Sequence, residues 1–326
     1  MCDGGYENRM KFSTKSSVNT WTEKQEKSGG MSPLDGIRMV LTAIAQPKSS
    51  YAMITGGSSG EYFYQWLSVG DSFRGAQTYG RGVHEAGLTP SASLMVVYLH
   101  GSNTVKLIEN FSPILPEVSC YVPDLDPETA DLTEASYRRL LHRLNTERPD
   151  ALVMFPNMFF RFVQKIHVHG GKVKHQPKYI DLSADFLFSF QYDFLKRYYP
   201  DSDIRMTYGC VEFGQIAQQI PRSQWKSPRD MFTYKVYGDC AHVENHPDGS
   251  LVVTSLLYKT LPLIRYNISD KARVADGPDG SQYLHDLVGK NKQDIDMVRT
   301  DREIDRMSRD WNLGVINFRY SPDVKT

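Results

Sequence analysis

The sequence predicts an α/β protein with a largely parallel sheet flanked by helices and a smaller antiparallel β-rich region. Short apolar runs alternate with helical stripes of apolar residues from about residue 94 to residue 208, which is typical of parallel strands joined by helices. After about Pro221, short β-like runs separated by turns replace this alternation, which favours antiparallel hairpins. A chain of 326 residues, 40% of them hydrophobic, is long enough to bury such a core.

The N-terminal third begins with a polar segment and becomes apolar later. Residues 1–30 have almost no aliphatic side chains and end in Gly-Gly, so we predict a flexible polar tail. Apolar residues at helical spacing predict an amphipathic helix over 34–45. A short apolar run follows at 51–54, and a buried strand is predicted at 94–99.

The pattern of apolar residues between about 131 and 208 predicts alternating helices and strands. Asp131-x-x-Glu134 fits a capping box before the helical stripe at 137–144, which Pro149 ends. Strands are predicted at 151–155, 179–182 and 204–208, and a helix at 186–199. The alternation in 166–171 predicts a surface strand with His167 and His169 on one face, a spacing that can chelate Zn²⁺ but lacks a third ligand nearby.

The last third predicts strands at 234–236, 241–245, 251–256 and 263–266, and mixed charges from Lys271 onward. We therefore divide the chain into the tail 1–30, an α/β core 31–220, a β-rich subdomain of the same core 221–275, and a charged C-terminal tail 276–326.

Charge and composition argue against several classes of protein. Lysine plus arginine and aspartate plus glutamate both number 38, so no overall basic field favours nucleic acid or an anionic membrane. The longest apolar runs are far shorter than the roughly 20 residues that span a bilayer. No secretory signal is evident, and four widely spaced cysteines do not form a disulfide framework. We expect a cytoplasmic protein.

Three polar motifs could carry chemistry, and each is weak by itself. The glycines and hydroxyls of ITGGSSGE at 54–61 could converge on phosphate oxygens, or form a plain linker. In TYGCVEFGQ at 207–215, an aromatic and Glu212 could stack a base and hold a metal–phosphate group, or simply end a strand. In LPLIRYNISD at 261–270, Asp270 could accept hydrogen bonds from a ribose diol, or pair with Arg265 at the surface.

Together and in this order, the motifs resemble those of the adenylate-forming enzyme superfamily. The stretch PDG…LVVTSL…LPLIRY at 247–266 resembles the phenylacetate–CoA ligase branch, as does Ser183-Ala184-Asp185 between a strand and a helix. The resemblance covers roughly residues 50–300 and implies the large N-terminal domain of that superfamily.

The resemblance implies that ATP and Mg²⁺ are cofactors and that a small-molecule carboxylic acid is adenylated with release of pyrophosphate. Tyr208 and Gly209 would border the adenine, Glu212 would hold Mg²⁺ and Asp270, with Arg265 in the same motif, would bind the ribose. The β- and γ-phosphates would be wrapped by the loop residues Thr55, Gly56, Gly57, Ser58, Ser59 and Gly60. The acid would lie near Ser183 and Ala184, with His100 and Asn103 as further candidates that could equally cap a strand end. The acceptor of the second step would be coenzyme A, an amine or a carrier-protein thiol.

The sequence also departs from the pattern of that superfamily. Glu61 stands where a lysine often follows the phosphate loop, and Asn-Ile-Ser-Asp at 267–270 replaces Arg-Thr-Gly-Asp. Only 271–326 follows Asp270, which is short for the C-terminal domain that carries the superfamily's catalytic lysine. We expect Lys290 and Lys292 to substitute for that lysine, or a separate protein to supply the domain.

Three alternatives stay open at this point. The chain could be a non-catalytic nucleotide-binding partner subunit, or an enzyme that uses ATP to activate a group other than a carboxylate. A structural Zn²⁺ held by Cys210, Cys240 and His242 is a weaker possibility, because a fourth ligand is missing.

Overall fold

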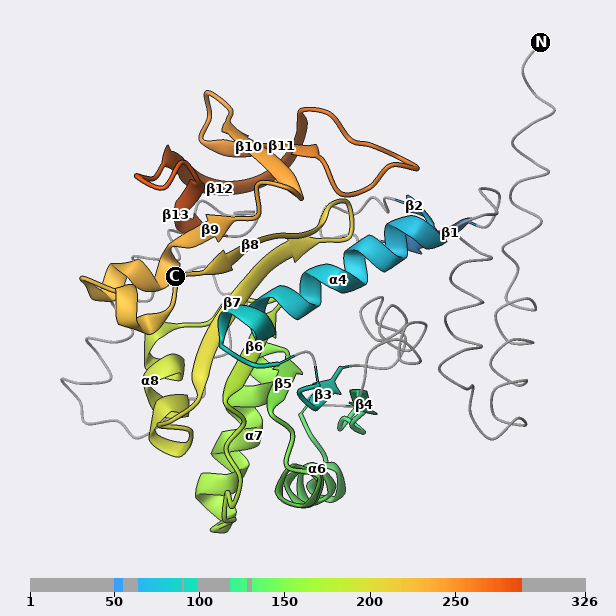
Figure 1. The fold of residues 1–326 in the computed structure, drawn as a ribbon. Coiled ribbons are helices and arrows are strands. Elements are labelled where there is room, and N and C mark those ends of the chain that lie inside the picture. Colours follow the sequence, from blue (N-terminus) through green and yellow to red (C-terminus); the bar gives the residue numbers. More distant parts are fainter. Residues whose placement is uncertain (1–49, 55–63, 90, 99–117, 128–130, 289–326) are drawn as a thin grey trace.

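The computed structural model describes residues 50–54, 64–89, 91–98, 118–127 and 131–288 (Figure 1). The tail 1–30, the helix predicted over 34–45 and the residues after 288 lie outside the described residues. Within the described ranges, no helix is long and apolar enough to cross a bilayer.

The described chain forms one large mixed sheet and a separate two-stranded hairpin. The hairpin consists of β1 (Ser50–Ile54) and β2 (Tyr64–Ser68), which pair antiparallel. The eleven-stranded sheet has the order β10-β11-β12-β13-β9-β8-β7-β6-β5-β3-β4. Its parallel half comprises β3 (Leu94–Val97), β4 (Val118–Tyr121), β5 (Ala151–Met154), β6 (Tyr179–Ser183) and β7 (Asp203–Cys210).

The antiparallel half continues from β7 in the same sheet. Its strands are β8 (Gly214–Gln219), β9 (Tyr234–Val236), β10 (Ala241–Asn245), β11 (Ser250–Ser255), β12 (Tyr266–Asp276) and β13 (Gln282–Val288). Two short 3-10 helices, Arg222–Gln224 and Pro228–Phe232, connect β8 to β9. The predicted α/β class is confirmed, but in the described sheet the antiparallel part, with the six strands β8–β13, is not smaller than the parallel part, which has five. Part of the segment predicted as a charged tail lies in this sheet, because β13 is placed between β12 and β9.

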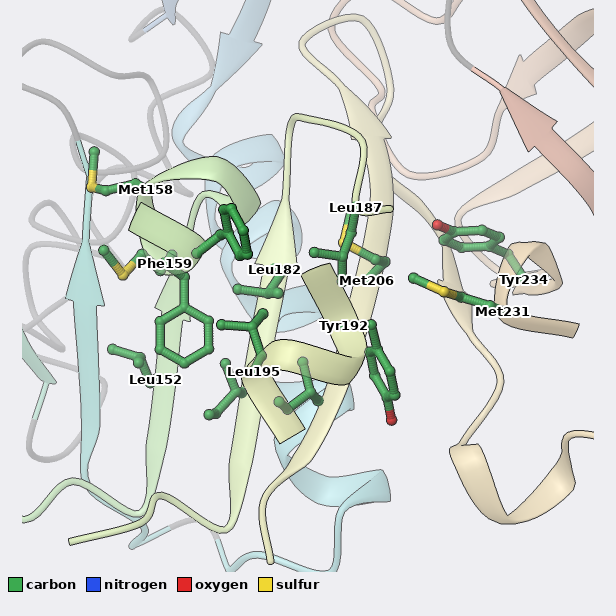
Figure 2. Packing of buried hydrophobic residues seen from close by; sticks show 14 of the residues in the cluster. Leu152, Met158, Phe159, Leu182, Leu187, Tyr192, Leu195, Met206, Met231 and Tyr234 are labelled. Carbon is green, nitrogen blue, oxygen red and sulfur yellow. The ribbon is translucent and has the colours of Figure 1, made fainter. Parts of the chain in front are cut away.

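In the described ranges, four helices connect or cover the strands. They are α4 (Val69–Glu85), α6 (Glu134–Glu147), α7 (Pro156–His169) and α8 (Ser189–Tyr198). The β6 strand shows how the two faces of the sheet differ. Ile180 and Leu182 join the main core with residues of α6, α7 and α8, whereas Tyr179 lies against Gly82 of α4. Figure 2 shows Phe159 of α7, Leu182 of β6 and Leu195 of α8 in that main core.

Several local predictions need correction. The segment 166–171 is not a strand, since α7 reaches His169 and ends at Gly170 with φ 68°. Pro156 at the first turn and apolar residues at 159, 162, 163 and 166 explain this helix, which buries that stripe in the main core. The N-cap of α6 is Thr133, whose side chain accepts a hydrogen bond from Ser136 N, and not Asp131. Residues 263–265 precede β12 and are not part of the strand.

Candidate functional site

The centre of the candidate site is a hydrogen bond between two motif residues that lie far apart in the sequence. The Tyr208 hydroxyl donates to Asp270 Oδ2 at 2.6 Å. Tyr208 lies on β7 and Asp270 on β12, and the strands β8, β9 and β13 separate them in the sheet order. A side-chain contact across that separation requires the antiparallel half to curl back over the end of β7. Burial, and then the charge of Asp270, raise the pKa of Tyr208 well above its usual value, so the phenol remains a donor.

Glu212 lies beside this pair in the turn between β7 and β8. Its side chain is buried, with 8% of the residue exposed. The Cys210 thiol donates a hydrogen bond to Glu212, and burial together with the Glu212 charge raises the pKa of that thiol well above its usual value. The charge of Glu212 also reaches Tyr266 at the start of β12, whose pKa is raised first by burial and then by that charge. Two carboxylates, Glu212 and Asp270, therefore share one partly enclosed region.

The β7–β8 turn needs glycine where the two strands meet. A Cβ on Gly209 would lie 3.0 Å from Gln215 Cα and closer still to the carbonyl oxygen of Gly214. Since backbone atoms cannot yield as a flexible side chain can, only glycine fits at this position. Gly214 itself has φ 71°. This geometry fixes the position of the intervening residues, including Glu212.

The loop after β6 lies next to the end of β7. Ser183 pairs in register with Thr207 in the parallel ladder, so Ser183-Ala184-Asp185 leaves the sheet beside Tyr208. Ala184 has φ 74°, an unusual value for a residue with a side chain, and such strain is found preferentially at functional sites. Asp185 accepts a hydrogen bond from Phe186 N at 2.8 Å and another from the Asn157 amide.

A third chain segment joins the end of β3 to this edge. The Tyr98 hydroxyl and Ser183 Oγ lie 2.6 Å apart in a hydrogen bond, and only 1% of Tyr98 is exposed. Carboxyl ends of β3, β6 and β7 therefore meet at one edge, which is where α/β sheets place their ligands. Sequence reasoning did not single out Tyr98 or Asn157, and it considered Cys210 only as a possible zinc ligand and not as the partner of Glu212. Asp185 was part of the quoted Ser-Ala-Asp step but was given no role.

The hairpin that flanks the predicted phosphate loop is tied to the segment leading into β12. Gln65 of β2 donates to the Leu261 carbonyl at 3.2 Å. Asp71, in the first turn of α4, accepts from Lys259 N at 2.7 Å and from Thr260 N at 3.1 Å. Burial opposes the charge of Asp71, but these bonds and those from the Thr260 and Ser68 hydroxyls outweigh it and lower its pKa to about 2. This carboxylate holds the two segments together.

Other predicted site residues are placed elsewhere or cannot be located. Arg265 is exposed, has φ 51° and pairs with Glu244, with Nε and Oε2 3.2 Å apart; the predicted alternative of a surface pair with Asp270 is not what forms. The phosphate-loop residues 55–60, the acid-pocket candidates His100 and Asn103, and the cations Lys290 and Lys292 lie outside the described residues.

The described residues contain no cluster of side chains that would support the predicted zinc sites. Among them no group of three or more histidine, cysteine, aspartate or glutamate residues could hold a metal ion. Cys240 packs with Leu67 and Tyr237, while Cys210 lies against the main core. The histidines predicted on one face diverge on α7: His167 bonds with the Tyr198 hydroxyl, and His169 pairs with Glu134.

Comparison with known proteins places the fold. No family model and no curated protein sequence matches this chain. Among solved structures, an open conformation of 2-hydroxyisobutyryl-CoA ligase in complex with 2-HIB-AMP and CoA matches with a TM-score of 0.55 and 14% identity, over 74% of this chain and 57% of that chain. The acyl-CoA synthetase (AMP-forming)/AMP-acid ligase II-like protein from Dyadobacter fermentans DSM 18053 matches with a TM-score of 0.53 and 14% identity, over 81% and 69% of the two chains. VinN matches with a TM-score of 0.54 and 13% identity, over 73% of this chain and 61% of that chain.

These likenesses establish the class of fold. The chain has an α/β fold similar to that of solved structures that include AMP-forming acyl-CoA ligases. The chain spans a little over half of the length of the 2-hydroxyisobutyryl-CoA ligase that it matches.

Proposed function

We propose that the chain binds ATP at the edge formed by Tyr208, Glu212 and Asp270 and uses it to adenylate a carboxylic acid. The observation that carries this proposal is the hydrogen bond from Tyr208 to Asp270, which joins two of the three motifs at the carboxyl edge of the parallel strands. The fold shared with AMP-forming ligases supports the same reaction class.

Each residue of this site has a separate task in the proposal. Asp270, oriented by the Tyr208 hydroxyl, accepts hydrogen bonds from the ribose diol. Tyr208 and Gly209 border the adenine. The phosphate loop 55–60 holds the β- and γ-phosphates, and β2, which follows it, is tied to the segment entering β12 through Gln65.

The donor set fits a magnesium ion that is shared with the nucleotide. A single buried carboxylate, Glu212, is suited to Mg²⁺ because this ion usually takes one or two carboxylates and completes its shell with phosphate oxygens and water. When bound, the ion neutralises phosphate charge. The protein's own contribution to the in-line attack of a carboxylate oxygen on the α-phosphorus is to position the reactants and to exclude water.

The acid is placed beside Ser183 and Ala184, where the strained turn and the Tyr98 hydroxyl meet. The acceptor of the activated acyl group in the second step is coenzyme A, an amine or a carrier-protein thiol. This choice follows from the resemblance to the phenylacetate–CoA ligase branch. We place the ATP-binding core at 31–220 with the β-rich region predicted at 221–275, which β13 extends to Val288. Lys290 and Lys292, or a separate protein, supply the positive charge at the α-phosphate.

The test is a calorimetric titration of ATP and Mg²⁺ into the wild type and the Asp270→Ala variant. Loss of a charge-assisted hydrogen-bond partner costs about 1.5–3 kcal/mol, so we expect ATP to bind roughly 10- to 150-fold more weakly. Asp276→Ala, which removes an exposed carboxylate from the same strand, is the matched control and should bind as the wild type does. Equal ATP affinity in the two variants would refute the assignment of Asp270.

A further inference from the structure

A cavity lies on the side of the sheet covered by α6 and α7. Its volume is about 540 Å³, and it is lined by residues of α6, the C-terminal end of α7 and the segment 171–174, with one side open to solvent. Five basic side chains line it: Arg138, His142, His169, Lys172 and Lys174. This size is within the range of small-molecule sites.

The cavity is distant from the proposed ATP site. Helix α7 begins directly after the carboxyl end of β5 and runs for 14 residues to His169. At 1.5 Å per residue, its far end is about 20 Å away from that edge. The cavity therefore opens at the amino edge of the parallel strands, and it cannot be part of the same binding site.

The backbone of Lys172 and Lys174 is tied to α6 through the Asn145 side chain. Asn145 donates from Nδ2 to the Lys172 carbonyl at 3.0 Å and accepts from Lys174 N at 2.7 Å. Val173 packs against the main core, whereas its two neighbours Lys172 and Lys174 are exposed. Arg138 and His142 are four residues apart and share one face of α6.

Positive charge at the cavity exceeds negative charge. None of the residues that line it is acidic. The nearby Glu134 carboxylate pairs with Arg138 at 2.9 Å and with His169 at 3.4 Å. In the part of the chain that the structure describes, neither the Lys172 nor the Lys174 ammonium forms an ion pair, so these two charges remain available to an anion.

The floor of the cavity is closely packed. A Cβ on Gly171 would approach the Tyr137 hydroxyl oxygen to 2.6 Å and Leu141 Cδ2 to 2.9 Å. A packed apolar floor below a cationic rim provides both a surface for a flat ring and partners for phosphate oxygens.

We propose that this cavity binds a small phosphate-bearing anion at a site separate from the ATP site. Lys172 and Lys174 bind the phosphate oxygens, and Arg138 completes the cationic rim. The concave shape favours a small molecule over the surface of a protein partner.

The experiment titrates inorganic pyrophosphate, and separately ADP, into the full chain without a divalent metal. Wild type is compared with Lys172→Gln/Lys174→Gln and with Lys178→Gln, which removes an exposed lysine outside the cavity lining. We expect the double variant to bind at least one probe about tenfold more weakly, and Lys178→Gln to bind as the wild type does. Arg138→Gln should also weaken binding, and melting temperatures establish that all variants are folded.

The two probes distinguish the source of the phosphate. Equal sensitivity of pyrophosphate and ADP supports a site for phosphate groups alone, whereas tighter binding of ADP supports a nucleotide. Absence of binding by both probes, or equal affinity in the wild type and the double variant, would overturn the proposal. Failure of the ATP assignment would appear separately, as ATP affinity that does not depend on Asp270.

Discussion

Asp181 is a buried carboxylate outside the candidate site, and its environment changes its protonation near neutral pH. It lies on β6, on the α4 side of the sheet, and only 3% of it is exposed. Burial raises its pKa to about 7, although the Thr207 hydroxyl donates to Oδ1 at 2.5 Å and the Arg205 charge is close by. The folded protein therefore retains a proton on Asp181 at a pH where the unfolded chain has released it.

This difference predicts that Asp181 makes folding stability decrease as the pH rises from about 4 to about 7. In that window the folded state binds more protons than the unfolded state, and the slope is about 1.4 kcal/mol per pH unit. Between about pH 5 and about pH 7.5, the wild type should lose about 2–3 kcal/mol more than Asp181→Asn. Urea unfolding of both proteins measures this, with Asp276→Asn as an exposed control; parallel pH profiles for wild type and Asp181→Asn would contradict it.

At the scale of single elements, the sequence predicted strands better than it predicted helix boundaries. The strands β5, β6, β7, β9, β10 and β11 lie where apolar runs predict them. The residues of α7 were missed, because the His-x-His alternation near its end imitates a strand while its stripe at 159, 162, 163 and 166 follows a helical period. Helix α8 begins at Ser189, three residues later than predicted.

Helix α4 allows a test of packing, since Gly80 and Gly82 lie in the same helix but only Gly82 is closely surrounded by other side chains. A Cβ on Gly82 would lie 2.5 Å from Gln218 Nε2 and closer to the Tyr179 hydroxyl, whereas a Cβ on Gly80 has no atom within 4 Å. Replacing glycine by alanine inside a helix stabilises it by about 0.5–1 kcal/mol, whereas overpacking a core costs about 1–3 kcal/mol.

We therefore expect Gly80→Ala to raise the free energy of unfolding and Gly82→Ala to lower it. The two variants share the same gain in helix propensity, so their difference of about 1–3 kcal/mol isolates the packing of α4 on Tyr179 and Gln218. Denaturant unfolding measures both values. Equal stabilisation by the two substitutions would show that α4 does not pack as closely as described.

At the scale of the whole molecule, the candidate site depends on how the two halves of the sheet are arranged. Local patterns could predict a strand that reaches Tyr208, although β7 continues to Cys210, and could predict that Asp270 lies near a strand. They could not predict the contact between them, because it depends on the curl of the antiparallel half across three intervening strands. Only the order of the motifs, through their resemblance to adenylate-forming enzymes, indicated that the two residues would bind parts of one nucleotide.

The position of the positive charge that assists adenylation also depends on the whole chain, because Lys290 and Lys292 lie beyond every other site residue in the sequence. If Lys290 or Lys292 provides it, changing that lysine to alanine should slow single-turnover adenylation about 10²- to 10³-fold, because a group that stabilises developing charge contributes several kcal/mol to the transition state. ATP affinity should change far less. Rapid adenylation that neither substitution affects would assign the cation to another residue or to another protein.

The most direct test of adenylation is pyrophosphate release by the purified chain with ATP, Mg²⁺ and a panel of carboxylic acids. We predict release that depends on one class of acid, is slow with this chain alone, and is lost in Asp270→Ala but kept in Asp276→Ala. Tight ATP binding with no acid-dependent release, even for an extended panel, would contradict the proposed enzyme and favour a non-catalytic nucleotide-binding subunit.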